Sequence, residues 1–165
     1  MGAGLAVFME DNEKTKKAAL RLLAFRPRSE SELRQRLAQK KLPADAIERT
    51  VDELRQSGML DDEKFAKLYA LSRIQSRAFG KDRVRRELSR RGLSGASVEN
   101  AMRSIEDIDE EAPARELAQK RLASMKGLPR EAKKRRLHGA LLRRGFSANV
   151  TFKVLDRLLG PSEEE

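Results

Sequence analysis

Apolar residues recur along the chain at the spacing of one face of an α-helix, and the same arrangement occurs three times. Each copy contains two apolar residues one helical turn apart, a third residue shortly after them, and a further apolar group at helical spacing. The anchors of the three copies are Leu33, Leu37 and Leu42; Val84, Leu88 and Leu93; and Leu137, Leu141 and Phe146. Self-similarity of this kind predicts a repeat protein in place of one irregular core.

The residues that end and begin helices repeat together with these anchors. The segment Arg90-Arg91-Gly92-Leu93-Ser94 of the second copy aligns with Arg143-Arg144-Gly145-Phe146-Ser147 of the third. In both, a glycine follows a helix, where a left-handed backbone is favoured, and a serine stands where the next helix needs a side-chain acceptor. The first copy has Lys41 and Pro43 at these positions, and Lys41 is a poorer residue for ending a helix.

A further helix precedes each pair of anchors, beginning near residue 14, after Leu60-Asp61-Asp62-Glu63, and near Pro113. The sequence therefore predicts an all-α fold of three tandem three-helix repeats, and no alternating segment predicts a strand. Because a unit of about 50 residues buries its apolar face poorly alone, we expect the repeats to form an elongated, curved array. The expected divisions are a flexible N-terminus at 1–13, repeats at 14–60, 61–109 and 110–160, and an acidic tail at 161–165.

Composition narrows the class of partner. The chain has 165 residues and a formal net charge of +10, which predicts an acidic partner such as nucleic acid, an anionic membrane or an acidic protein. No apolar run reaches the roughly 18 residues that a membrane-spanning helix needs. The chain contains no Cys, which excludes disulfides and fits a reducing compartment. We therefore expect a cytoplasmic protein that does not enter a membrane.

The residues that usually perform catalysis are scarce. His138 is the single histidine, no thiol is present, and neither a Gly-rich phosphate loop nor a zinc-ligand spacing occurs. The acidic cluster at 107–111 lacks the glycine turn of a calcium loop and is interpreted as a linker whose carboxylates favour the next helix dipole. We expect no enzyme, cofactor or metal. A metal-dependent nuclease, the enzymatic alternative, would have to use Asp61, Asp62 and this cluster.

Basic residues gather on the middle helices of the second and third copies, beside the buried anchors. Clustered like charges repel one another, which favours a role in binding phosphate or acidic protein, although exposed Lys and Arg also serve solubility. Few aromatic residues accompany them, so neither base stacking nor sequence-specific base readout is predicted. The candidate contact residues are Arg83, Arg86, Arg90, Arg91, Lys133, Arg135, Arg136, Arg143 and Arg144. The secondary candidates are Arg26, Arg28, Lys40 and Arg73.

The order of these motifs over residues 18–159 resembles the RecX family of bacterial regulatory proteins. Arg26-x-x-Ser29-x-x-Glu32-Leu33-x-x-x-Leu37 is similar to the signature of the first repeat, and Leu60-Asp61-Asp62-x-x-Phe65-Ala66 to the junction that follows it. Gly80-x-x-Arg83-x-x-x-Glu87-Leu88-x-x-x-Gly92 and Leu142-x-Arg144-Gly145-Phe146-Ser147 continue the series. The chain departs from the pattern at Lys41, where the family commonly has glycine, and at Thr151, where it usually has an aliphatic residue.

The resemblance implies a modulator of the RecA recombinase, usually an inhibitor. It implies binding in the groove of the RecA filament on single-stranded DNA, with reduced strand exchange and reduced ATP hydrolysis by RecA. No catalytic residue and no cofactor are implied for this chain, which we expect to be a monomer. Besides the nuclease, one alternative stays open: an independent basic helical module that binds duplex DNA tightly through its phosphates without RecA. For the RecA regulator, direct DNA binding is expected to be weak.

Overall fold

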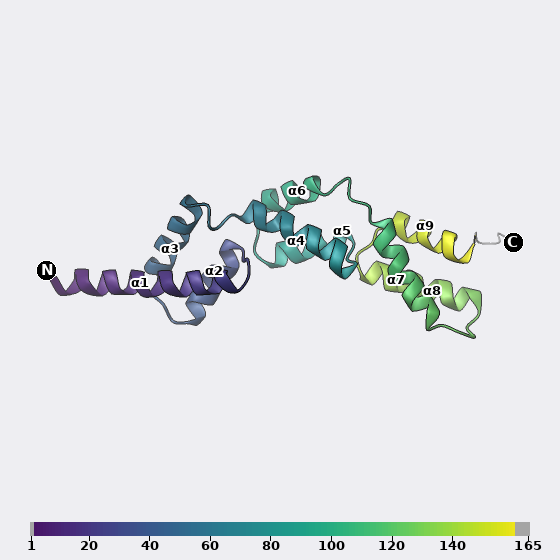
Figure 1. Cartoon of the computed structure of the whole chain (residues 1–165), viewed down its shortest axis with the longest axis horizontal. Helices are drawn as coiled ribbons and strands as arrows, with labels where there is room; N and C mark the ends of the chain where they lie inside the picture. The colour runs from purple at the N-terminus through teal and green to yellow at the C-terminus, as the bar shows by residue number, and fades with distance from the viewer. Residues whose placement is uncertain (1, 161–165) are drawn as a thin grey trace. The chain divides into compact units, whose positions relative to one another are not determined.

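The computed structural model describes residues 2–160, which form nine α-helices and no strand (Figure 1). The first three helices are α1 (Gly2–Phe25), α2 (Glu30–Gln39) and α3 (Ala44–Gln56). The next three are α4 (Asp62–Arg77), α5 (Lys81–Arg90) and α6 (Gly95–Ser104). The last three are α7 (Glu111–Ala123), α8 (Arg130–Arg143) and α9 (Ala148–Leu159). The predicted all-α fold is confirmed, and none of these helices is both long and apolar enough to cross a membrane.

Helix α1 begins at Gly2, well before the start near residue 14 that the sequence predicts. Contacts with α3 account for the additional turns: the guanidinium of Arg49 lies 4.1 Å from the centre of the Phe8 ring, and its Nε donates to Asn12 Oδ1 at 3.0 Å. Residues 2–13, the segment that we expected to be a flexible N-terminus, therefore belong to helix α1. The predicted acidic tail lies outside the described residues.

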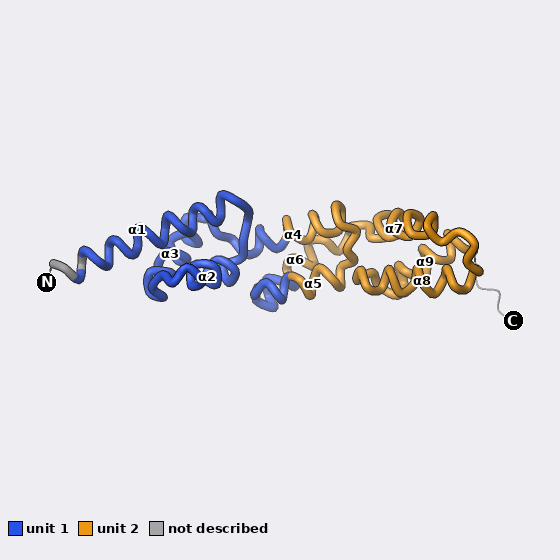
Figure 2. The backbone as a smooth tube through the Cα atoms, turned by 90° about the horizontal axis from the view of Figure 1, so that it is seen from below, with its two compact units in different colours: residues 1–66, 88–99 blue, residues 67–87, 100–165 orange. Residues whose placement is uncertain are grey.

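The chain divides into two compact units (Figure 2). Unit 1 comprises residues 1–66 and 88–99, and unit 2 comprises residues 67–87 and 100–165. Helices α1 to α3 lie in unit 1 and helices α7 to α9 in unit 2, while the division passes through α4, α5 and α6. Each unit therefore includes one complete group of three helices and part of the middle group.

Each unit has its own hydrophobic core, built on the anchors that the sequence repeats. The core of unit 1 contains Ala19, Leu33, Leu37, Ile47, Val51, Leu54 and Leu60. The core of unit 2 contains Ala114, Ala118, Leu137, Leu141, Phe146, Val154 and Leu155. Thr151 occupies a fully buried position on α9, and its hydroxyl has no hydrogen-bond partner among the described residues.

The helix ends have the backbone geometry that the repeated motif predicts. Lys41, Gly92 and Gly145 all have a left-handed backbone, with φ of 58°, 76° and 83°. Each donates its N–H back to the end of the preceding helix at 2.9–3.0 Å, as Gly145 N does to Leu142 O at 2.9 Å. The hydroxyl of Ser147 accepts from Val150 N at 3.2 Å and so caps α9. The predicted end-and-start motif is thus present in all three groups of helices, with Lys41 in the place of a glycine.

Candidate binding surface on the basic helices

The start of α2 meets the end of α5 at a junction within unit 1. The hydroxyl of Ser29 donates to the carbonyl of Arg91 at 2.8 Å, and Arg91 Nη1 donates to Glu32 Oε2 at 3.1 Å. Gly92 approaches α2 so closely that a Cβ on it would lie 2.5 Å from the Cβ of Ser31. Glycine is therefore required at position 92 by its positive φ and, independently, by the neighbouring helix.

The start of α5 meets the end of α8 in the same way within unit 2. Gly80 N donates to the carbonyl of Arg144 at 2.9 Å, and Asp82 N donates to the carbonyl of Gly145 at 3.3 Å. Arg144 Nη1 donates to the carbonyl of Arg77 at 2.9 Å. A Cβ on Gly80 would overlap the backbone of Gly145, well inside the 3.0 Å that real Cβ atoms keep. The second arginine of each Arg-Arg-Gly segment is thus a junction residue.

Two carboxylates complete these junctions. Asp62 Oδ1 accepts from Glu30 N at 2.8 Å, and Glu110 Oε1 accepts from Lys81 N at 2.6 Å. Each satisfies a backbone donor in the first turn of the middle helix of the preceding group. Burial raises the pKa of both the Asp62 and the Glu110 carboxyl groups. Glu110 belongs to the acidic cluster at 107–111, so this cluster contains a junction contact in addition to a linker.

The neighbouring acids cap their own helices. Asp61 Oδ1 accepts from Glu63 N and Lys64 N, both at 3.0 Å. Asp109 Oδ1 accepts from Glu111 N at 2.8 Å, as the dipole interpretation of this segment predicts. Over residues 2–160, no group of three or more His, Asp or Glu side chains is arranged to hold a metal ion. Four of the acids that a nuclease would need, Asp61, Asp62, Asp109 and Glu110, therefore accept hydrogen bonds from backbone N–H groups at helix starts.

Several predicted contact residues are already held within the chain. Arg28 is buried and donates to Glu32 Oε1 at 2.6 Å and to the carbonyl of Leu22 at 3.2 Å. Arg26 and Arg91 bind the same carboxylate. Burial alone would raise the pKa of Glu32, but the hydrogen bonds and charges of Arg26 and Arg28 lower it overall. Glu32 therefore joins three arginines of unit 1, which leaves them less available to a partner.

Glu87 plays a comparable part in unit 2. It accepts from Tyr69 Oη at 2.6 Å and from Arg83 Nε at 3.1 Å, and Arg73 Nε lies 3.9 Å from it. Arg83 also stacks on the ring of Phe79, 3.8 Å from its centre. Burial acts to raise the pKa of Glu87, but the hydrogen bonds from Tyr69 and Arg83 lower it overall. Arg73 and Arg83 thus have structural partners.

The remaining candidates are free of ion pairs within the described part of the chain. On α8 these are Lys133, Arg135, Arg136 and Arg143, which we call the basic face of α8. Arg135, Arg136 and Arg143 are exposed, while Leu137, Ala140 and Leu141 of the same helix are buried. The others are Arg90, exposed Lys40 and Arg86, whose Nε donates to the carbonyl of Asp82 at 3.2 Å. Within the described residues, seven predicted contact residues are therefore without an ion pair, and four of them lie on α8.

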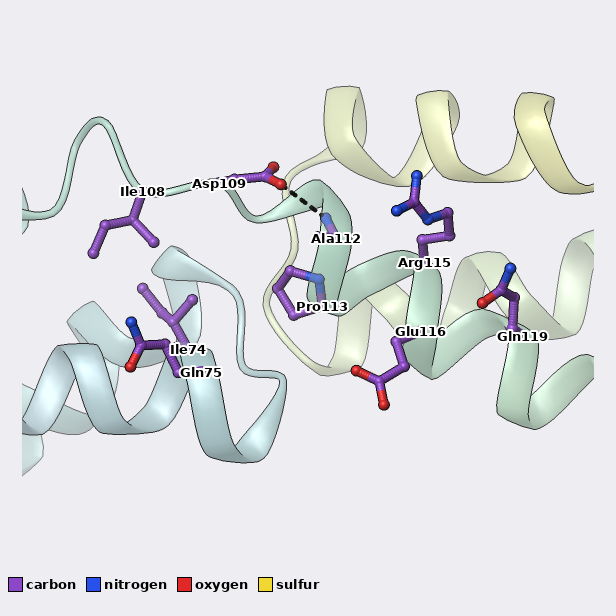
Figure 3. A pocket seen from close by; sticks show the side chains of 9 residues that line it. All are labelled: Ile74, Gln75, Ile108, Asp109, Ala112, Pro113, Arg115, Glu116 and Gln119. Atoms are coloured by element: carbon purple, nitrogen blue, oxygen red, sulfur yellow. Dashed lines mark hydrogen bonds between the residues drawn. The ribbon is translucent and has the colours of Figure 1, made fainter.

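The sequence pattern did not predict two pockets that the structure contains. A pocket of about 600 Å³ in unit 2 lies between α4, the connection from α6 to α7, and α7 (Figure 3). Ile74, Ile108 and Pro113 give it an apolar wall, and Arg115 and Glu116 lie along α7 at its edge. A smaller pocket of about 310 Å³ lies in unit 1. Both are lined by side chains from separate segments of the chain, so only the packed structure reveals them.

Comparisons with known proteins follow the three groups of helices. The profile described as the first three-helix domain of RecX matches residues 16–54, that of the second domain matches residues 61–102, and that of the third matches residues 109–155. Together they match most of the chain, in the order of the repeats.

Whole-chain relatives and solved structures agree with these profiles. The chain is 35% identical to "Regulatory protein RecX" of Thermobifida fusca, over 82% of this chain and 74% of the relative. It is 33% identical to the protein of the same name from Mycolicibacterium vanbaalenii, over 92% and 86% of the two chains. The crystal structure of RecX from Lactobacillus salivarius shares the fold, with a TM-score of 0.80 at 21% identity over 91% of this chain and 97% of that one.

Proposed function

Because the chain belongs to the RecX family of regulatory proteins, we propose that it binds the RecA filament on single-stranded DNA and inhibits strand exchange and ATP hydrolysis by RecA. The chain acts by binding and not as an enzyme, which agrees with the regulatory names of its relatives and with the structural use of its acidic residues. We further propose that it acts as a monomer in the cytoplasm, where RecA and the chromosome are found.

The observation that supports a binding role is the unpaired charge on α8. Arg135, Arg136 and Arg143 are exposed and form no ion pair within residues 2–160, so they repel one another without compensation in the free protein. An acidic protein surface or a row of phosphates would relieve that repulsion and accept hydrogen bonds from the guanidinium groups. Electrostatic attraction of this kind also speeds association with a highly charged filament.

The test is a strand-exchange and ATPase assay with purified bacterial RecA on single-stranded DNA, with increasing amounts of this protein. The variant reverses the basic face of α8: Lys133→Glu, Arg135→Glu, Arg136→Glu and Arg143→Glu. A matched control makes the same change of net charge at exposed lysines elsewhere: Lys17→Glu, Lys64→Glu, Lys67→Glu and Lys126→Glu. We expect the wild type and the control to inhibit RecA and the α8 variant to lose most inhibition.

Two results would contradict the proposal. Absence of any effect of the wild-type protein on RecA filaments would remove the assigned partner. Equal inhibition by the α8 variant and the control would move the contact to another surface, because both variants carry the same net charge. Circular dichroism of both variants checks that the helix content is unchanged.

The same basic face supports a second candidate function, direct binding to DNA phosphates without RecA. It predicts that the affinity for duplex DNA falls steeply with the logarithm of the salt concentration. Fluorescence anisotropy of a labelled duplex, titrated with the protein at several salt concentrations, measures that slope. Binding that is weak and insensitive to the α8 variant would exclude this candidate and leave the RecA filament as the partner.

A further inference from the structure

The chain contains one helix-end contact in two complete copies and one incomplete copy. Lys40, Arg91 and Arg144 each directly follow the middle helix of their group, and each is followed by a residue with a left-handed backbone. In the second and third groups, the carbonyl at this helix end accepts a hydrogen bond from the start of another helix. The basic side chain binds Glu32 in the first turn of that helix in the second group, and the carbonyl of Arg77 at the end of α4 in the third group. The same helix-end contact thus binds the start of a helix in both groups.

The complete copy in unit 1 shows which chemistry this helix end accepts. Arg91 offers its carbonyl to the N-cap hydroxyl of Ser29 and its guanidinium to Glu32, a carboxylate in the first turn of α2. A helix start carries unsatisfied N–H groups and a partial positive charge, so carboxylates there are common and favourable. In unit 1, the partner of this helix end is therefore a helix start with a carboxylate in its first turn.

In the first group the same helix end is exposed. Lys40 and Lys41 are both exposed, and neither forms an ion pair within the described residues. Gly92 and Gly145 have no room for a Cβ because another helix lies against them, whereas Lys41 has a full side chain at a φ of 58°. The end of α2 is therefore an unoccupied copy of the docking contact.

A pocket beside this helix end adds an apolar component. It measures about 310 Å³ and is lined by Ala18, Arg21, Leu22, Phe25, Arg28 and Lys40. Phe25 is 83% exposed, more than the other exposed large apolar side chains among the described residues. Arg21 and Lys40 stand at the same pocket without an ion pair among residues 2–160. The pocket suits an apolar side chain that is accompanied by carboxylates.

We propose that the end of α2 and this pocket bind an acidic helix start of a partner protein. Carboxylates in the first turn of that helix would pair with Lys40, Lys41 and Arg21, and an apolar side chain from its second turn would contact Leu22 and Phe25. Nucleic acid fits less well, because phosphates offer nothing for the apolar wall of the pocket. This site is separate from the basic face of α8 and does not depend on the function proposed above.

A second copy of this chain is a poorer occupant than another protein. The starts of α2 and α5 are covered within their own chain. Acids at the starts of α3, α4 and α7 already have partners there, namely Asp45 with Arg49, Asp62 with Glu30 N and Glu111 with Arg157, so the start of α8 remains to be considered. Helix α8 has 14 residues, against 10 in α2 and 10 in α5, and the additional residues extend its start. Arg130 at that start donates to the carbonyls of Leu159 and Gly160, both at 3.0 Å. Its first turn therefore presents a single carboxylate, Glu131, directly after a basic residue that is tied to α9.

The test uses a fluorescein-labelled, acetylated helical peptide of about 15 residues. Its first turn reads Ser-Glu-Glu-Glu and its second turn carries Leu and Phe; a control peptide replaces each Glu with Gln. Fluorescence anisotropy measures binding to the full-length protein, to a Lys40→Glu/Lys41→Glu variant and to a Lys126→Glu/Lys153→Glu control of equal net charge. We expect the first variant to weaken binding of the acidic peptide about tenfold or more, since two charge-assisted contacts become repulsive, and the control to change it less than about twofold.

A third variant, Phe25→Ser, tests the apolar part of the site and should also weaken binding, with unchanged helix content by circular dichroism. Equal affinity for the acidic and the Gln peptide, or equal loss in the two lysine variants, would overturn the proposal. Displacement of the peptide by a poly-thymidine oligonucleotide, with the same dependence on Lys40 and Lys41, would identify a phosphate site instead. Sedimentation that shows a dimer lost on Lys40→Glu/Lys41→Glu would identify a second copy as the occupant and would equally overturn it.

Discussion

Replacing Gly145 with alanine separates the two reasons why a glycine is needed at a helix junction. Gly145 has a φ of 83°, and a Cβ on it would lie 2.5 Å from the backbone nitrogen of Arg83 and 2.9 Å from its Cα. Gly127, in the same unit, has a φ of 79°, but a Cβ there would meet no atom within 4 Å. Gly127→Ala therefore introduces only backbone strain, whereas Gly145→Ala introduces the same strain and a collision with α5.

Backbone strain and the steric collision contribute separately to the loss of stability. A non-glycine residue in the left-handed region costs about 1–2 kcal/mol. Forcing apart packed backbone that cannot rotate away costs about 1–3 kcal/mol more, by analogy with overpacked cores. We therefore expect Gly127→Ala to lower the free energy of unfolding by about 1 kcal/mol and Gly145→Ala to lower it by about 3 kcal/mol. Gly80→Ala, whose Cβ would overlap Gly145 without a positive φ, should show the collision alone.

Urea unfolding followed by circular dichroism at 222 nm measures these differences, with the slope m compared between variants to confirm that the same surface unfolds. In thermal scans, a difference of about 2 kcal/mol corresponds to a midpoint lower by about 4–8 °C for a chain of this size. Equal losses in Gly145→Ala and Gly127→Ala would show that the close approach of α8 to α5 contributes nothing to stability. The junction would then have to be looser in solution than the hydrogen bonds from Gly80 and Asp82 indicate.

Three further changes should alter stability. Thr151→Val removes a buried hydroxyl without a hydrogen-bond partner and should raise the free energy of unfolding by about 1 kcal/mol. The matched change Thr15→Val removes a hydroxyl that donates to the carbonyl of Asp11 at 2.7 Å and should lower the free energy of unfolding by about 1 kcal/mol. Urea unfolding measures both changes. Burial raises the pKa of Glu110, so the folded state binds a proton more readily than the unfolded state. Wild type should therefore gain stability relative to Glu110→Gln as the pH falls through the raised pKa toward about 4, and parallel stability curves of the two proteins would contradict this. Lys41→Gly should raise the melting temperature, because it relieves a positive φ of 58° at an exposed position; an unchanged or lower midpoint would show that Lys41 stabilises the helix end.

The repeat and its helix ends could be predicted from the sequence because they depend on local physics. Apolar spacing determines which face of each helix is buried, and Leu33, Leu37, Leu137 and Leu141 lie in the cores as their spacing predicts. Glycine and serine at the helix ends follow from backbone conformation and the first unsatisfied N–H groups. The true start of α1 could not be predicted in this way, because it depends on a contact with Arg49 of another helix.

The candidate site could be predicted only as a set of basic residues, and tertiary structure decided which of them are free. Within Arg143-Arg144, the side chain of Arg143 is exposed and that of Arg144 binds the carbonyl of Arg77, although nothing in the sequence distinguishes the two arginines. Consecutive residues point about 100° apart around a helix, so one faces solvent while the next faces a neighbour. Which neighbour is there, and whether it offers a carbonyl or a carboxylate, depends on contacts between residues far apart in the chain. For this protein, the sequence alone determined the helices, their buried faces and their ends, while the packing of helices against one another decided which charges remain for a partner.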